Sequence, residues 1–104
     1  MVVIFELNGK KFMGLNGGPL FKFNESVSFV VDCETQEEID FYWDRLSQGG
    51  SEGQCGWLKD QFGLSWQIVP SILPQLLAEP QKADRIMNAL LQMKKFDIEK
   101  LKQA

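Results

Sequence analysis

Two short apolar runs, rich in aromatic residues, flank a tight-turn signal in the middle of the chain. The runs are residues 53–59 and 64–69, and Asp60-Gln61-Phe62-Gly63 separates them. Runs this short, with β-branched and aromatic residues, favour strands over helices. Pro70 has no amide hydrogen to donate and ends the second run. The sequence therefore predicts two strands joined by a tight turn here.

Three more strands are expected before this pair. Residues 2–7 are rich in β-branched residues, and the Asn8-Gly9 turn signal predicts that residues 11–15 return antiparallel to them. Two glycines and a proline at residues 16–19 end the second strand. Residues 26–31 alternate in character, which predicts a third strand with one buried face.

Helices are expected between the strands and after them. Thr35 and Glu38 fit a capping box, in which each side chain binds the other residue's amide. Apolar residues at three- and four-residue spacing follow, and Gly49-Gly50 ends this helix. Beyond Pro70 the pattern predicts helices over residues 71–78 and 81–95, and a short piece with Asp97 as its N-cap. Antiparallel strands with one inserted helix indicate an α+β fold.

Composition narrows the classes of function. The 104 residues suffice for one domain, residues 1–104, and 11 basic against 14 acidic residues give a net charge of −3. We expect no nucleic-acid partner, because the basic residues are scattered, and no membrane partner, because no apolar run is long enough to span a bilayer. No signal-peptide pattern opens the chain, so a cytoplasmic location is expected.

The chain has no histidine, which excludes Ser-His and Cys-His nucleophilic systems and histidine-ligated metals. The only cysteines are Cys33 and Cys55, and their spacing matches no zinc motif. A catalytic thiol needs a neighbour that lowers its pKa, so small buried hydrophobic residues are the favoured interpretation of both.

Five separated motifs resemble one family and occur in its order. They are Leu15-Asn16-Gly17-Gly18-Pro19, Ser28-Phe29-Val30-Val31 with Cys33-Glu34-Thr35-Gln36-Glu37-Glu38, Tyr42-Trp43, Cys55-Gly56-Trp57-Leu58-Lys59-Asp60 and Phe62-Gly63-Leu64-Ser65-Trp66-Gln67-Ile68-Val69-Pro70. Together they resemble the demethylubiquinone methyltransferase-like branch of the glyoxalase, bleomycin-resistance and dioxygenase superfamily, the vicinal oxygen chelate fold. The resemblance covers essentially the whole chain.

This resemblance implies βαβββ modules whose mixed, mainly antiparallel sheet curves into a cup. Residues 1–19 would be the hairpin of a partial N-terminal module, residues 26–69 a complete C-terminal module, and residues 71–104 a helical tail. Family chains usually begin with a further segment of roughly fifty residues, within the usual range of domain sizes. The chain is thus expected either to be a truncation or to use a second subunit, and we predict a homodimer because unpaired sheet edges favour pairing.

The superfamily's metal enzymes hold a divalent ion through histidine and glutamate. By resemblance, the last-strand glutamate falls at Gln67, and the first-strand ligand falls near Ser26 or Ser28. An amide and a hydroxyl are weak ligands for a transition metal. We therefore expect no metal and no cofactor. Gln67 either points into the cup, with Trp66 and Ile68 under the helix, or faces outward, and strand alternation favours the first interpretation.

The candidate site is one for a small-molecule ligand. Aromatic residues are more often plain core, and an Asn before glycine is common in ordinary turns, so each assignment has a purely structural alternative. The residues predicted to bind the ligand are Asn16, Phe23, Trp57, Trp66 and Gln67.

Three functions remain open from the sequence. A metal-free small-molecule-binding protein of the bleomycin-resistance type is the favoured one. An enzyme of the same superfamily, methyltransferase-like in name, is the alternative, although Gly17-Gly18 does not lie in a strand-to-helix turn as a methyl-donor site would require. The third is an assembly remnant with no intact pocket.

Overall fold

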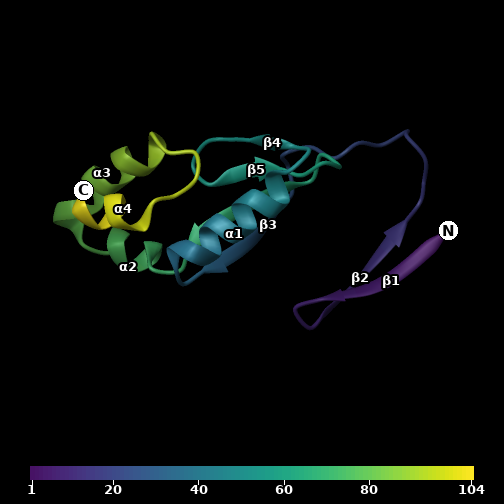
Figure 1. Cartoon of the computed structure of the whole chain (residues 1–104), viewed down its shortest axis with the longest axis horizontal. Coiled ribbons are helices and arrows are strands. Elements are labelled where there is room, and N and C mark those ends of the chain that lie inside the picture. Colours follow the sequence, from purple (N-terminus) through teal and green to yellow (C-terminus); the bar gives the residue numbers. More distant parts are fainter.

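A computed structural model of the chain describes all residues, Met1–Ala104. The strands form two separate sheets, one of two strands and one of four, and the C-terminal helices gather at the end of the molecule far from the two-stranded sheet (Figure 1). The molecule is elongated, with dimensions of 52 × 26 × 23 Å. No helix is both long enough and apolar enough to cross a membrane.

The two-stranded sheet is a hairpin of β1 (Val2–Leu7) and β2 (Lys10–Leu15), paired antiparallel. Asn8 and Gly9 both have positive φ, at 51° and 81°, as the predicted tight turn requires. All six residues of β1 are exposed. The residues that follow, up to the start of the next strand, form a long extended linker (Figure 1).

The four-stranded sheet contains β3 (Ser28–Cys33), β4 (Ser51–Glu52), β5 (Trp57–Lys59) and β6 (Ser65–Pro70), and α1 (Gln36–Ser47) connects β3 to β4. The strand order is β3-β6-β5-β4. The β3 and β6 strands are parallel, whereas the other two pairs are antiparallel. The expected α+β class and βαβββ module are confirmed.

Two strands begin at least two residues later than predicted, each for a local reason. The third strand begins at Ser28 and not at residue 26, because Asn24 Oδ1 accepts from both the amide and the hydroxyl of Ser26 and forms a turn there. The run at residues 53–59 is a strand only from Trp57, because Cys55 and Gly56 have positive φ, at 58° and 82°.

The first core lies between α1 and one face of this sheet. The Thr35 hydroxyl accepts from the Glu38 amide, as predicted, and this fixes where α1 begins. The other half of the predicted capping box is displaced by one residue, because the Glu38 carboxylate accepts from the Glu34 amide and not from that of Thr35. The apolar face of α1 packs against the strand side chains that point toward the helix. The buried members are Cys33, Ile39, Trp43, Leu58, Ile68 and Ile98.

The C-terminal helices are α2 (Leu73–Leu77), α3 (Pro80–Leu91) and α4 (Ile98–Gln103). They surround a second core of Ile86, Leu90, Phe96 and Leu101. The third helix ends at Leu91, earlier than predicted. Just beyond this helix, the Met93 and Lys94 carbonyls accept from the Cys55 and Gly56 amides at 2.8 Å each. These carbonyls are therefore not available for hydrogen bonds within a helix.

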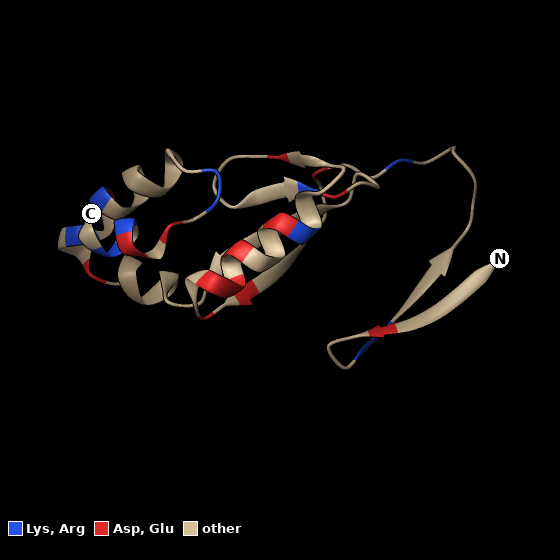
Figure 2. Cartoon of the chain, viewed as in Figure 1, with Lys and Arg blue, Asp and Glu red and all other residues tan.

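Charge is distributed unevenly over these parts. Acidic residues follow one another along α1, basic residues gather in the C-terminal helices, and most of the hairpin is uncharged (Figure 2). The uncharged surface includes many exposed apolar side chains, among them Ile4 and Met13, each 67% exposed. The hairpin is therefore an apolar surface that the rest of the chain leaves uncovered.

Candidate functional site

The face of the four-stranded sheet opposite α1 has a polar centre. Because side chains alternate along a strand, Trp66 and Ile68 turn toward α1 while Gln67 turns the other way. Register then places Val30 of β3 and Trp57 of β5 on either side of Gln67. Gln67 thus lies on the face expected to form the cup, in the middle of three strands.

Gln67 is held by a neighbouring strand. Its Nε2 donates to the Ser28 Oγ at 2.9 Å. This bond leaves the Gln67 Oε1 free to accept and the Ser28 hydroxyl free to donate, since no intramolecular partner occupies either. The pair can therefore recognise a group that both donates and accepts hydrogen bonds.

Ser65 adds a third polar group to this face. It lies directly beside Ser28 in the parallel register and two residues before Gln67. Its side chain is fully buried, and its Oγ has no hydrogen-bond partner in the protein. A buried hydroxyl without a partner costs about 1–3 kcal/mol.

An ion pair lies next to Ser65. Lys59 is opposite Ser65 in the antiparallel register, and its Nζ pairs with the carboxylate of Glu25 from the linker. The hydrogen bond from Lys59 lowers the pKa of Glu25 below its ordinary value, helped by the Glu25 backbone. Both side chains are well exposed, so the pair tethers the linker to the edge of this face but adds little stability.

The donor set at this centre does not suit a transition metal. The positions where the resemblance placed metal ligands hold the Gln67 amide and the Ser28 hydroxyl, which bind each other. Neither supplies the charge or basicity of a carboxylate or an imidazole. No cluster of three or more His, Cys, Asp or Glu side chains occurs elsewhere in the chain.

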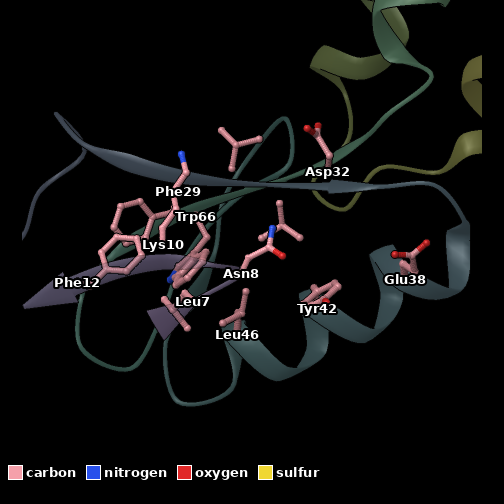
Figure 3. Close-up of a pocket in the computed structure, with 12 residues that line it drawn as sticks. Leu7, Asn8, Lys10, Phe12, Phe29, Asp32, Glu38, Tyr42, Leu46 and Trp66 are labelled. Atoms are coloured by element: carbon pink, nitrogen blue, oxygen red, sulfur yellow. The ribbon is translucent and has the colours of Figure 1, made fainter. Parts of the chain in front are cut away.

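A hollow of about 740 Å³ lies along the outer edge of β3, between the hairpin and α1, and Phe29, Val30, Val31 and Asp32 all line it. In Figure 3, the hairpin residues Phe12 and Leu7 lie on the α1 side of β3, whereas Asp32 points away from the helix. A row of four aromatic rings connects the hairpin to the sheet, in the order Phe5, Phe12, Phe29 and Trp66. The centroids of successive rings are 5.7, 5.7 and 5.3 Å apart.

The five predicted ligand-binding residues do not form one pocket. Trp57 and Gln67 share the open face, whereas Trp66 lies on the opposite face and lines the hollow. Phe23 lines a separate depression with Phe21 and Phe62. Asn16 follows the hairpin, where its amide donates to the Met1 carbonyl at 3.0 Å.

Sequence reasoning named Ser28 only as one of two positions near the expected first-strand metal ligand, and it did not select Ser65. Both are small, and neither belongs to a motif that indicates chemistry by itself. The signal that would have found them is the alternation of β3 and β6, which places Ser28, Ser65 and Gln67 on one face once the two strands are known to be parallel neighbours.

Trp66 is oriented by the turn before β6. The Asp60 Oδ1 accepts from the amides of Phe62 and Leu64, at 2.9 and 3.0 Å. The Asp60 Oδ2 accepts from the Trp66 indole at 3.0 Å. One carboxylate therefore shapes the predicted turn and fixes the ring that joins the core to the hollow.

Cys33 is not a nucleophile. Burial raises the pKa of its thiol to about 11, and the nearby charges of Glu38 and Asp32 act in the same direction. Below that pH it remains a neutral thiol inside the first core. Cys55 is half-buried, and both cysteines are free.

Comparison with known proteins assigns the family. A sequence profile described as 3-demethylubiquinone-9 3-methyltransferase matches residues 1–69. The chain belongs to this family. The 3-demethylubiquinone-9 3-methyltransferase profile ends at the last residue before Pro70, so it covers the hairpin and the βαβββ module but not the helices α2 to α4.

Solved structures agree with this family assignment. A PhnB protein from Bacillus cereus is 34% identical, with a TM-score of 0.63 over 68% of this chain and 64% of that one. Protein PA1353 from Pseudomonas aeruginosa is 17% identical, with a TM-score of 0.55 over 67% of this chain and 62% of that one, and shows the shared fold. The chain thus spans less than two thirds of either protein. No functionally curated protein matches the sequence.

Proposed function

We propose that this chain is a small-molecule-binding protein of the vicinal oxygen chelate superfamily that holds its ligand on the open face of the four-stranded sheet. The observation that carries the proposal is the Gln67–Ser28 hydrogen bond at 2.9 Å, which presents one free acceptor and one free donor at the centre of that face. The ligand needs no metal ion, because an amide and a hydroxyl occupy the ligand positions.

The surroundings of the pair define the ligand class. The Trp57 ring lies beside Gln67 in register and offers a flat apolar surface, and Val30 lies on the other side. A planar ring stacks well on an indole. The ligand is therefore a small ring compound that carries a carbonyl or hydroxyl group, with the ring against Trp57 and the polar group at Gln67 and Ser28.

Ligand-observed NMR with a library of ring compounds, each bearing a carbonyl or hydroxyl group, tests this function. The best binder is then titrated against Gln67→Leu, which removes the amide at similar volume, and against Gln61→Leu on the exposed turn as the matched control. We expect Gln67→Leu to weaken binding about tenfold, since a polar ligand group loses its partner. Equal affinity for both variants, or binding only after a divalent metal is added, contradicts the proposal.

A methyltransferase is the second candidate, favoured by the description of the matching family. Methyl-donor sites usually follow a glycine-rich turn between a parallel strand and a helix. Here Gly17 and Gly18 lie in the linker after β2, with no helix behind them. Calorimetric titration with S-adenosylmethionine decides between the two candidates, and micromolar binding of this donor would favour the enzyme.

A further inference from the structure

Lys59 is the only basic residue in the four-stranded sheet. The strands β3 to β6 contain two acidic residues, Asp32 and Glu52, and no other lysine or arginine. Leu58 is buried against α1, so strand alternation turns Lys59 and Trp57 toward the open face. The sheet therefore places a single cation on its open face, two residues along β5 from the Trp57 ring.

Register places this cation close to the proposed site. Ser28, Ser65 and Lys59 form one row across three strands. Gln67 and Trp57 belong to the next row. Rows that face the same way are about 7 Å apart along a strand, and a lysine side chain is long and flexible. A ligand that stacks on Trp57 and binds Gln67 therefore has Lys59 within reach of a second substituent.

A carboxylate from the linker occupies this cation. Glu25 is the only acidic residue of the linker, residues 16–27, and its carboxylate pairs with the Lys59 ammonium. The Asn24 Oδ1 accepts from the amide and the hydroxyl of Ser26, so the backbone around Glu25 is held in a tight turn. The chain's own carboxylate therefore lies at the position that a negatively charged ligand group would take.

The Glu25–Lys59 contact can be exchanged at low cost. The Glu25 side chain is 59% exposed and that of Lys59 is 43% exposed. Ion pairs between exposed side chains add little stability, because water screens them. A ligand that also stacks on Trp57 and binds Gln67 gains these additional contacts when its carboxylate binds Lys59. Such a ligand can therefore compete with Glu25.

We propose that the ligand of the open face is an anionic ring compound whose carboxylate, or a similar group, displaces Glu25 from Lys59. The inference rests on the proposed function and specifies its ligand class. Glu25 is a stand-in for the ligand anion, and its displacement releases the linker from the sheet. A neutral ring compound gains nothing from Lys59 and leaves the ion pair in place.

Compounds that differ only in charge test this ligand class on the full chain. The probes are para-acetylbenzoate and para-acetylbenzamide, used with the corresponding meta isomers, and each pair shares its ring and its ketone. We expect the benzoate to bind about fivefold more tightly than the amide in NMR titrations at low salt, and salt to reduce this difference. Binding of the amide with equal or higher affinity overturns this inference and leaves the proposed function intact.

Lys59→Met tests the cation. It removes the charge at similar side-chain length, and Lys100→Met removes an equal charge from an exposed position of α4 as the matched control. We expect Lys59→Met to abolish the preference for the benzoate over the amide, and Lys100→Met to retain it. Equal preferences in the two variants contradict the assignment of Lys59.

Glu25→Gln tests the displacement. It removes the competing carboxylate and should tighten the binding of the benzoate about threefold, with no change for the amide. Glu52→Gln, at an exposed position of β4, makes the same change in net charge and should have little effect. If Glu52→Gln tightens binding as much as Glu25→Gln, the gain comes from overall charge, and the displacement is rejected.

The carboxyl NMR signal of Glu25 reports the displacement without mutation. The hydrogen bond from Lys59 lowers the pKa of Glu25, so this pKa should rise toward its ordinary value when the benzoate binds Lys59. The Asp40 carboxyl, whose pKa Lys95 lowers in the same manner, is the internal control and should not change. A benzoate that binds without a change at Glu25 contradicts this inference. No binding of any ring compound, neutral or anionic, to wild type or to Glu25→Gln rejects the proposed function together with it.

Discussion

The two ends of the chain contain similar apolar residues, yet only one end is held by the central module. Every residue of β1 is exposed, and the ring pair of Phe12 and Phe29 is the hairpin's aromatic contact with the module. In the C-terminal part, Phe96 is 3% exposed and Leu101 fully buried. The difference shows that apolar content does not decide burial by itself. Backbone and side-chain hydrogen bonds that fix a segment against the module decide it.

Three contacts fix the C-terminal part. The backbone around Gly56 approaches Phe96 so closely that an added Cβ would lie 2.6 Å from its ring. The Gln36 side chain donates to the Phe96 carbonyl at 2.9 Å and accepts from the Ile98 amide at 2.8 Å. Lys95 pairs with Asp40 at 2.9 Å. The hairpin makes no hydrogen bond and no ion pair with the module.

Phe96→Ala should have the largest effect. It leaves a cavity in the second core and should lower the free energy of unfolding by about 3–5 kcal/mol. The control Phe21→Ala removes a ring that is 88% exposed and should change this energy by less than about 0.5 kcal/mol. Urea denaturation measures both. Similar losses would mean that the two ends do not differ as described.

Gly56→Ala should cause the second-largest loss of stability. With φ at 82°, any side chain is strained there, and its Cβ would also lie 2.9 Å from the Ile68 carbonyl oxygen. We expect the free energy of unfolding to fall by about 2 kcal/mol or more. Gly17→Ala in the linker, where nothing lies within 4 Å, should be neutral or slightly stabilising. A stable Gly56→Ala variant would show that the loop can move away from Phe96.

Gln36→Ala should release the segment before α4. The Phe96 carbonyl and the Ile98 amide would lose their partner, at a cost of about 1–2 kcal/mol. Hydrogen exchange should speed up at Ile98, while the β6 amides stay protected. The exposed Gln81→Ala serves as the control. Unchanged exchange at Ile98 would mean that the packing of Phe96 alone holds this segment.

The Lys95–Asp40 ion pair should contribute least to the free energy of unfolding. Lys95→Met should cost about 0.2–1 kcal/mol in low salt and less in high salt. The hydrogen bond from Lys95 lowers the pKa of Asp40 from its ordinary value of 3.8. The pair therefore stabilises above that value, and its contribution disappears as pH falls through the lower, folded-state pKa. Denaturation of wild type and variant should differ at pH 7 and converge in acid.

Local signals were sufficient for much of the fold. The Asn8-Gly9 turn, the Thr35 cap and the Asp60 turn each act within a few residues, and all three appear as predicted. Boundaries set by distant contacts could not be predicted in this way. The early end of α3 depends on the amides of Cys55 and Gly56, about forty residues away, so helical periodicity could not locate it.

The candidate site was predictable only in part. Alternation correctly placed Gln67 on the face away from α1. It could not place Phe23, because a linker residue has no fixed periodicity, and Phe23 lies by a separate depression. Ser28 and Ser65 become neighbours only through the parallel pairing of β3 with β6, which joins segments far apart in the chain.

Trp66 gives this protein a built-in optical reporter. Its indole is bound by Asp60 on one side and reaches the hairpin through Phe29 and Phe12 on the other. Departure of the hairpin would let water approach the ring, while Trp43, 3% exposed in the first core, would keep its surroundings. Emission from a variant that retains only Trp66 would therefore report hairpin attachment, and emission from one that retains only Trp43 would report unfolding of the first core.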